Sequence, residues 1–169
     1  YLFSSIILFI TLNSFAQQEE KTISLDGAWE IIFDNNNEGI VGKWYLNKNY
    51  DSQSGIKEID VPSCWEEYEK DYEGVGFYRK KFRRPDSWDG KILELKFDAS
   101  NYMTQVWLNE QVVGFHEGGY NPFSFRIDKL AKPGVENTLL RSYPKNASDC
   151  RWRQLKRQRN RSRARGRCS

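Results

Sequence analysis

The side chains best suited to chemistry lie in one loop that follows a predicted β-hairpin. His116 is the only histidine of the 169-residue chain, and Glu117 follows it directly. An imidazole titrates near neutral pH, so this pair could act as a general base. Beside a hairpin end and two glycines, however, an imidazole more often fixes loop geometry by hydrogen bonding. We therefore favour a structural role for His116 over a catalytic one.

The same loop continues through Tyr120 to Pro122. Its glycines permit unusual backbone conformations, its proline is rigid, and its remaining side chains are polar or aromatic. Loops of this composition often carry binding sites. The stretch therefore predicts a binding surface more than a catalytic centre.

Paired carboxylates are the other chemical candidates, because two of them can supply a general acid and a general base. Glu66 with Glu67, and Asp71 with Glu73, are the pairs that could do so. All four lie in predicted loops, where a solvated surface role is commoner, and we assign no catalytic residue to this chain.

Three cysteines are too few for a disulfide framework, and only Cys64 lies in the part predicted to fold. We expect Cys64 to be a buried, unpaired thiol. Cys150 and Cys168 have no metal-ligand spacing, so we predict neither a metal site nor a cofactor.

Aromatic side chains could offer flat faces to the C–H groups of a sugar. For Trp65, sugar stacking and core packing are about equally supported. Tyr78 and Phe82 alternate with charged residues, which favours the core. We assign Trp29 and Trp107 to core or interdomain packing.

Alternating apolar and polar residues separated by turn residues predict an all-β protein, and no stretch shows sustained helical periodicity. Leu93, Leu95 and Phe97 illustrate the alternation, since Glu94 and Lys96 lie between them. An antiparallel β-sandwich or jelly roll follows. The predicted strands are Ala28–Phe33, Ile56–Val61, Phe77–Phe82, Lys91–Phe97, Met103–Leu108, Gln111–Phe115, Phe123–Ile127 and one from Thr138 onward.

The two ends differ in composition from the body. Residues 1–16 contain an apolar run followed by small residues, which is typical of a signal peptide, here without a starting Met or basic leader; residues 17–22 form a polar spacer. Residues 141–169 hold 11 Lys and Arg against one acidic residue. With Pro144 expected to end the last strand early, we interpret this tail as sequence translated in a wrong frame or as a disordered extension. The predicted domain is 23–140.

Several segments of this body resemble, in order and spacing, the N-terminal domain of glycoside hydrolase family 2, which includes β-galactosidases, β-glucuronidases and β-mannosidases. The resemblance spans about Ile23 to Leu139. It rests on SLDGAWEIIFD (24–34), VPSCWEE (61–67), DYEGVGFYRKKF (71–82), and then FDAS, VWLNE, GFHEGG and NPFSF between Phe97 and Phe125.

This resemblance implies a galactose-binding-domain-like jelly roll whose loop lies near the mouth of a catalytic barrel. Trp65, His116, Glu117 and Tyr120 are then the candidates to lie near substrate. Family 2 enzymes carry their catalytic glutamates on a (β/α)8 barrel of about 250 residues, for which this chain has no room. The resemblance therefore implies a truncated fragment without catalytic residues.

Two positions depart from the family pattern. Cys64 stands where some members have a substrate-contacting Asn, and Arg126 stands where Asp is common. A thiol cannot replace the paired donor and acceptor of an amide, and arginine reverses the charge of an aspartate. We expect no direct sugar recognition by these two residues.

The sequence as a whole predicts the N-terminal domain of an exported glycosidase, secreted or periplasmic, that hydrolyses O-glycosyl bonds and is inactive without its barrel. Its expected partners are a β-glycoside and the missing barrel domain, with no membrane contact after signal cleavage. The alternative is a free-standing carbohydrate-binding module. Basic runs bind phosphates, but we do not expect nucleic acid to be the ligand of an exported protein.

Overall fold

The computed structural model describes residues 21–100, 103–144 and 155–158, and within these ranges nearly every regular element is a strand. One short helix, α1 (Asn47–Asp51), and two 3₁₀ turns, η1 (Trp65–Glu67) and η2 (Asp86–Trp88), interrupt them. The strands are β1 (Thr22–Ile23), β2 (Gly27–Asp34), β3 (Lys57–Val61), β4 (Val75–Arg83), β5 (Ile92–Phe97), β6 (Met103–Leu108), β7 (Gln111–Glu117), β8 (Phe123–Arg126), β9 (Glu136–Pro144) and β10 (Leu155–Gln158).

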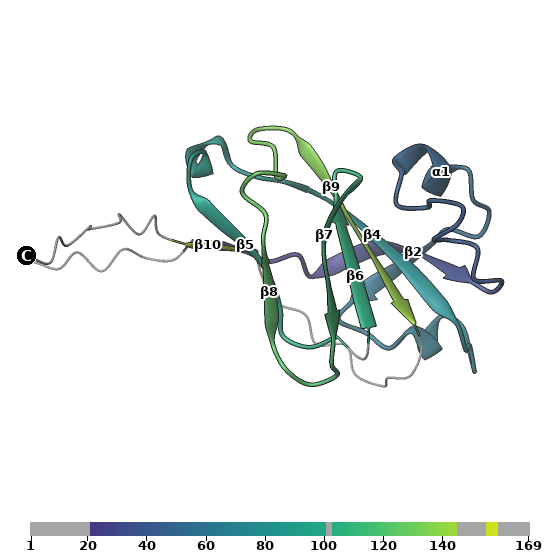
Figure 1. The fold of residues 1–169 in the computed structure, drawn as a ribbon. Helices are drawn as coiled ribbons and strands as arrows, with labels where there is room; N and C mark the ends of the chain where they lie inside the picture. The colour runs from purple at the N-terminus through teal and green to yellow at the C-terminus, as the bar shows by residue number, and fades with distance from the viewer. Residues whose placement is uncertain (1–20, 101–102, 145–154, 159–169) are drawn as a thin grey trace, which may run out of the picture.

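These strands form two antiparallel sheets (Figure 1). The larger sheet has the order β3-β2-β4-β9-β6-β7, and the smaller has the order β1-β10-β5-β8. The predicted all-β antiparallel sandwich is confirmed. Most predicted strands match an observed strand to within two residues at each end, because side-chain alternation marks a strand whose faces differ in burial.

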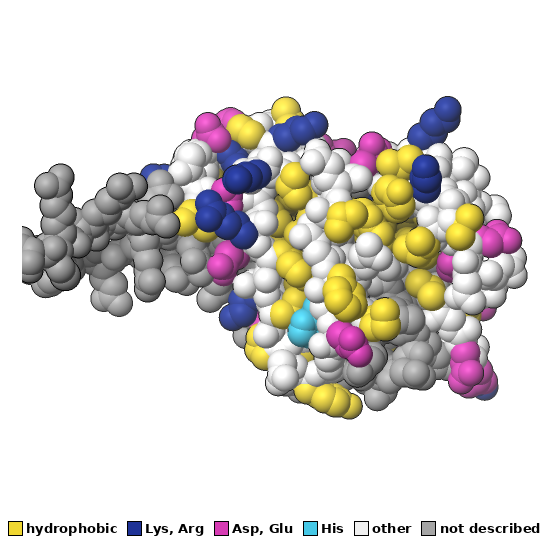
Figure 2. All heavy atoms as spheres, viewed as in Figure 1, with side chains coloured by type: hydrophobic (Ala, Val, Ile, Leu, Met, Phe, Trp, Pro, Cys, Tyr) yellow, Lys and Arg dark blue, Asp and Glu magenta, His cyan; other side chains and the backbone are white. Residues whose placement is uncertain are grey.

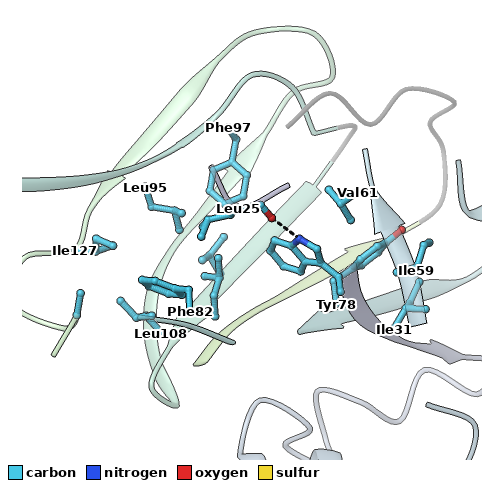
Figure 3. Packing of buried hydrophobic residues seen from close by; sticks show 14 of the residues in the cluster. Leu25, Ile31, Ile59, Val61, Tyr78, Phe82, Leu95, Phe97, Leu108 and Ile127 are labelled. Carbon is cyan, nitrogen blue, oxygen red and sulfur yellow. Dashed lines mark hydrogen bonds between the residues drawn. The ribbon is translucent and has the colours of Figure 1, made fainter. Parts of the chain in front are cut away.

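The main core lies between the two sheets (Figure 3). Leu95 and Phe97 of β5 point into it. Leu93 belongs to the same cluster, as the alternation of the three residues predicts. Trp29 lies in the same core, and its indole N–H donates a 2.7 Å hydrogen bond to the carbonyl oxygen of Leu25. Tyr78 and Phe82 are also buried here, so the core assignments for these aromatic residues are confirmed.

A second, smaller core lies on the outer face of the larger sheet, beneath the chain between β2 and β3. The Asp34 carboxylate accepts hydrogen bonds from the backbone N–H groups of Glu38 and Gly39, at 2.9 and 2.8 Å, which turns the chain back over the sheet. We call residues 35–56 the outer cover. It buries Ile32, Trp44, Tyr50, Phe77, Trp107 and Leu140.

The outer cover also buries a charge. Arg79 lies on the outer face of β4, pairs with Glu30 and Asp51 at 2.5 and 2.6 Å, and places its guanidinium 4.0 Å from the centre of the Tyr50 ring. Arg79 follows the core residue Tyr78 and so lies on the face of β4 opposite the main core. It is nevertheless almost completely buried, because a loop packs over this face of the sheet.

The C-terminal boundary differs from the sequence prediction. Strand β9 continues through Arg141 and Ser142 to Pro144 and pairs with β4 over its whole length, so the sheet extends beyond residue 140. Proline is tolerated because it is the last residue of the strand. Strand β10 pairs with β1 and β5. The predicted signal peptide and the rest of the basic tail lie outside the described residues.

Burial of tyrosines gives the fold a testable dependence on alkaline pH. Burial, followed by the Asp34 charge, raises the pKa of Tyr72 from 10.0 to about 12, and burial raises the pKa of Tyr50 as well. Above pH 10 the unfolded chain therefore binds fewer protons than the folded one, and stability falls as pH rises through about 12. The free energy of unfolding, measured by urea denaturation across this pH range, should fall as pH rises. It should fall less steeply with pH in the Tyr72→Phe protein. A slope that is the same in both proteins would contradict the assignment.

Candidate functional site

The candidate loop begins where β7 ends and leads into β8. The imidazole of His116 stacks on the ring of Phe123, with centroids 3.8 Å apart and planes 13° apart. Phe123 in turn stacks on Phe97 at 4.7 Å, so the histidine is held by a column of rings that reaches the core. Its position is determined by stacking, whereas the sequence had suggested hydrogen bonding.

The same stack limits the chemistry of His116. Its Nε2 atom is buried and has no hydrogen-bond partner among the described residues. A Cβ atom at Gly118, whose φ is +142°, would lie 3.2 Å from this nitrogen, so the loop passes close over the ring. An acid or base must reach its substrate, and this nitrogen faces protein.

Glu117 and Tyr120 are oriented differently from the histidine. Glu117 is the next residue of β7, so it points to the opposite face, where it is exposed. The Tyr120 side chain is 78% exposed. Glu117 and Tyr120 are thus exposed, as are Asn121 and Pro122, whereas His116 is partly buried.

Trp65 lies in η1 and packs into the core, with only 3% of its surface exposed. Its ring meets Tyr72 edge-on at 5.5 Å and Phe33 at 5.9 Å. A Cβ atom at Gly76 would come within 2.8 Å of the indole, so glycine lets this ring sit directly against β4. Of the two alternatives for Trp65, core packing accords with this burial.

The two departures from the family pattern lie at the surface. Cys64 is exposed, so the prediction of a buried thiol is wrong: the turn after β3 carries the side chain outward while its neighbour Trp65 points in. Arg126 makes two hydrogen bonds to Asp128 and lowers the pKa of that carboxyl group.

The predicted acidic pairs, Glu66 with Glu67 and Asp71 with Glu73, are all exposed.

One hollow was not predicted from the sequence. Strand β2 pairs with β4 only from Glu30 onward, and where the strands separate, Lys80 Nζ donates to the Ala28 carbonyl oxygen at 2.6 Å. The charge-rich run of β4 was the available signal, but the sequence could not indicate which strand it faced. The pocket has a volume of about 200 Å³ and is lined by Ala28, Trp29, Glu30, Glu58, Arg79, Lys80 and Lys81.

Other kinds of site are not found in the described parts of the chain. There, no cluster of three or more His, Cys, Asp or Glu side chains could hold a metal ion. No helix in the same residues is long and apolar enough to cross a membrane.

The family model described as "Glycosyl hydrolases family 2, sugar binding domain" matches residues 66–143, from η1 to β9. This segment contains the ring column and the loop after β7. Residues 66–143 form a family 2 sugar-binding domain.

Sequence similarity to known proteins covers more of the chain than this family 2 domain. A β-glucuronidase of Bacteroides fragilis is 33% identical over 125 residues, which are 70% of this chain and 17% of that protein. A β-galactosidase of Thermoanaerobacter pseudethanolicus is 31% identical over 116 residues, covering 69% of this chain and 14% of that protein. The chain thus spans less than a fifth of the length of these two relatives.

Solved structures share the fold of the family 2 domain. A Ruminococcus gnavus β-glucuronidase in complex with D-glucuronic acid superimposes with a TM-score of 0.69 at 26% identity, covering 78% of this chain and 23% of that one. A Lactobacillus rhamnosus β-glucuronidase gives a TM-score of 0.67 at 28% identity, covering 76% of this chain and 22% of that one.

Proposed function

We propose that this chain is the non-catalytic N-terminal domain of an exported family 2 glycosidase that hydrolyses O-glycosyl bonds of β-glucuronides or β-galactosides. The observation that carries the proposal is the match of residues 66–143 to the family's sugar-binding domain. The β-glucuronidase and β-galactosidase relatives support the substrate class. The exposure of the acidic pairs Glu66 with Glu67 and Asp71 with Glu73 accords with a solvated surface role, and a glycosidase instead holds its two carboxyl groups on either side of the scissile bond.

In the whole enzyme the loop after β7 would help to shape the sugar subsite. The ring column holds His116 and hence the start of the loop, while Glu117 and Tyr120 face outward. An aromatic ring and a carboxylate suit the C–H faces and hydroxyl groups of a sugar. We therefore place substrate contact at these two residues and a positioning role at His116.

Absence of turnover by the chain alone is the first expectation. The purified chain should not hydrolyse nitrophenyl β-glucuronide or nitrophenyl β-galactoside, because family 2 enzymes carry their catalytic glutamates on a (β/α)8 barrel and the described acidic pairs are exposed residues. Release of nitrophenol is followed by absorbance, and the Bacteroides fragilis β-glucuronidase serves as positive control. Hydrolysis that purifies with the chain and survives further chromatography would refute the proposal.

A free-standing carbohydrate-binding module is the second candidate, and the exposure of Tyr120 favours it. The described tryptophans are all buried, so their fluorescence is a poor reporter of sugar binding. Calorimetric titration with glucuronic acid and galactose, with Tyr120→Ala as the comparison, tests this candidate. A saturable heat of binding in the chain, absent in Tyr120→Ala, would establish that the domain binds sugar by itself. If the chain releases no heat of binding, the loop contributes to sugar binding only beside a barrel.

Export and the basic tail belong to the same proposal. Residues 1–16 would direct secretion or periplasmic export, which fits an enzyme that meets glycosides outside the cytoplasm. A nucleic-acid-binding tail would instead predict salt-sensitive affinity that disappears on deletion of residues 151–169. We expect no such binding by an exported protein.

A further inference from the structure

The outer face of the β6–β7 hairpin carries an apolar patch that is exposed among the residues the structure describes. Met103, Val112 and Phe115 are 44%, 61% and 58% exposed. We call these three residues the hairpin patch. Figure 2 shows hydrophobic side chains over the part of the surface where Figure 1 places β6 and β7.

A β-bulge puts the patch on one face. Val112 and Phe115 are three residues apart and would point to opposite faces of a regular strand. Pairing runs from Gly114 opposite Val106 to Val112 opposite Trp107, which leaves Val113 as the extra residue. Val112 thus shares a face with Trp107, and Phe115 shares that same face through its partner Gln105. Bulges characteristically re-aim side chains in this way.

The outer cover, residues 35–56, ends at the edge of this patch. Tyr45 of the outer cover stacks on Trp107 with centroids 5.3 Å apart and planes 3° apart. Glu110 in the hairpin turn accepts a 2.8 Å hydrogen bond from the backbone N–H of Asn47, which ties the turn to helix α1. Trp107 is consequently buried, whereas Val112, directly opposite on β7, is exposed.

We propose that the hairpin patch is the surface on which the remaining polypeptide of the family 2 enzyme docks, through a complementary apolar surface. This inference rests on the proposed function. Matched relatives continue for more than four-fifths of their length outside the matched region, so a covalently attached partner is present in them. A tethered neighbour can use a small surface because its effective concentration is high. Three side chains fall well short of the roughly 20–30 residues a side of a free dimer interface.

Docking here would also serve the candidate site. Strand β7 carries Val112 and Phe115 of the patch on one face and His116 on the other, and it runs directly into the loop that bears Tyr120. Contact at Phe115 would therefore hold this loop against the neighbouring part of the enzyme. Phe115 and His116 are neighbours on β7 and point to opposite faces, so this contact is compatible with the stacking of His116 on Phe123.

Met103 supplies a direct test because it is the only methionine of the chain. The 125-residue matched segment of the Bacteroides fragilis β-glucuronidase would be replaced by the corresponding residues of this chain. Hydrogen peroxide converts an accessible methionine to the sulfoxide, and mass spectrometry follows the Met103 peptide. We expect oxidation to be several-fold slower in the chimera than in the 169-residue chain. Equal rates would overturn the proposal.

A pair of matched substitutions separates docking from internal packing. Val112→Ser alters the patch, and Val135→Ser alters a valine that is 47% exposed elsewhere on the domain. We expect Val112→Ser to lower the unfolding temperature of the chimera and to leave the isolated chain unchanged, with Val135→Ser silent in both. Equal effects of the two substitutions in the chimera would overturn the proposal. So would a dimer of the isolated chain that Val112→Ser abolishes in sedimentation.

Activity of the chimera distinguishes this proposal from the proposed function. Hydrolysis of nitrophenyl β-glucuronide with an unprotected Met103 would overturn docking and leave the proposed function standing. A folded, inactive chimera with a protected Met103 would support docking and count against the proposed function. The two inferences therefore fail in different measurements.

Discussion

Replacing Trp107 by alanine should lower the free energy of unfolding by about 3–5 kcal/mol, the range for truncating a buried aromatic side chain. Trp107 is 2% exposed and belongs to the smaller core. It stacks on Tyr45 at 5.3 Å and on Phe77 at 6.5 Å, so it joins the outer cover to the sheet. Alanine would leave a cavity beneath the outer cover and weaken the packing of the cover on the sheet.

Urea unfolding followed by circular dichroism measures this loss. Val112→Ala is the matched control, because Val112 lies directly opposite on β7 but is exposed, and it should change stability by no more than about 0.5 kcal/mol. Trp107→Phe should retain part of the stacking and fall between the two. Equal stability of the Trp107→Ala and Val112→Ala proteins would show that the outer cover contributes nothing to the fold.

Asn137→Asp is expected to cost at least about 3 kcal/mol, although the two side chains have nearly the same shape. The Asn137 side chain is fully buried at the start of β9. Its oxygen accepts from the Asn109 amide and the Lys132 backbone N–H, at 2.8 and 2.7 Å. Its nitrogen donates to the carbonyl oxygens of Lys132 and Val135, at 2.9 and 3.1 Å. A carboxylate cannot donate, so two buried carbonyl groups would face a negative charge.

The pH dependence of this variant provides a second signature. Burial, together with the two carbonyl oxygens that face the second oxygen, raises the folded-state pKa of the introduced carboxyl group above its unfolded value of about 4. Destabilisation should therefore be small below that pH and grow as pH rises and the unfolded chain ionises first. Asn36→Asp adds the same charge at an exposed position and should be nearly neutral. A pH-independent loss would contradict the hydrogen-bond assignment.

Trp107 and Asn137 both position the hairpin that bears the candidate loop. Trp107 lies on β6, and Asn137 holds Asn109 in the turn between β6 and β7. Asn109 and Glu110 both have positive φ, 50° and 68°, as the two central residues of a tight hairpin turn require. Substitution of Trp107 or Asn137 would therefore free the first residues of the loop after β7 as well as destabilise the domain.

Much of this architecture could be predicted from the sequence because it follows from local patterns. Alternation in Leu93, Leu95 and Phe97 marks a strand with one buried face, and the turn at Asn109 and Glu110 separates two such strands. The family motifs were recognisable because they combine these same strands with the loop that follows β7. Residues 66–143, which the family model matches, lie within or close to the domain that the motifs predicted.

The site was predictable only in part, because exposure depends on neighbours remote in sequence. Spacing placed His116, Glu117 and Tyr120 in one loop, but stacking on Phe123 is what turns His116 inward. Nothing local distinguished a sugar-stacking Trp65 from a packed one. Its burial arises from Phe33 and Tyr72, which come from other parts of the chain.

The sequence by itself therefore determined the class of fold, the hairpin and the family, since strand alternation, turn residues and ordered motifs are local properties of the chain. Only the tertiary structure decided which side of the larger sheet meets solvent. The outer cover buries Arg79 and Trp107 but does not extend over the hairpin patch. Burial of a face depends on which distant segment packs on it, and periodicity describes only the face itself.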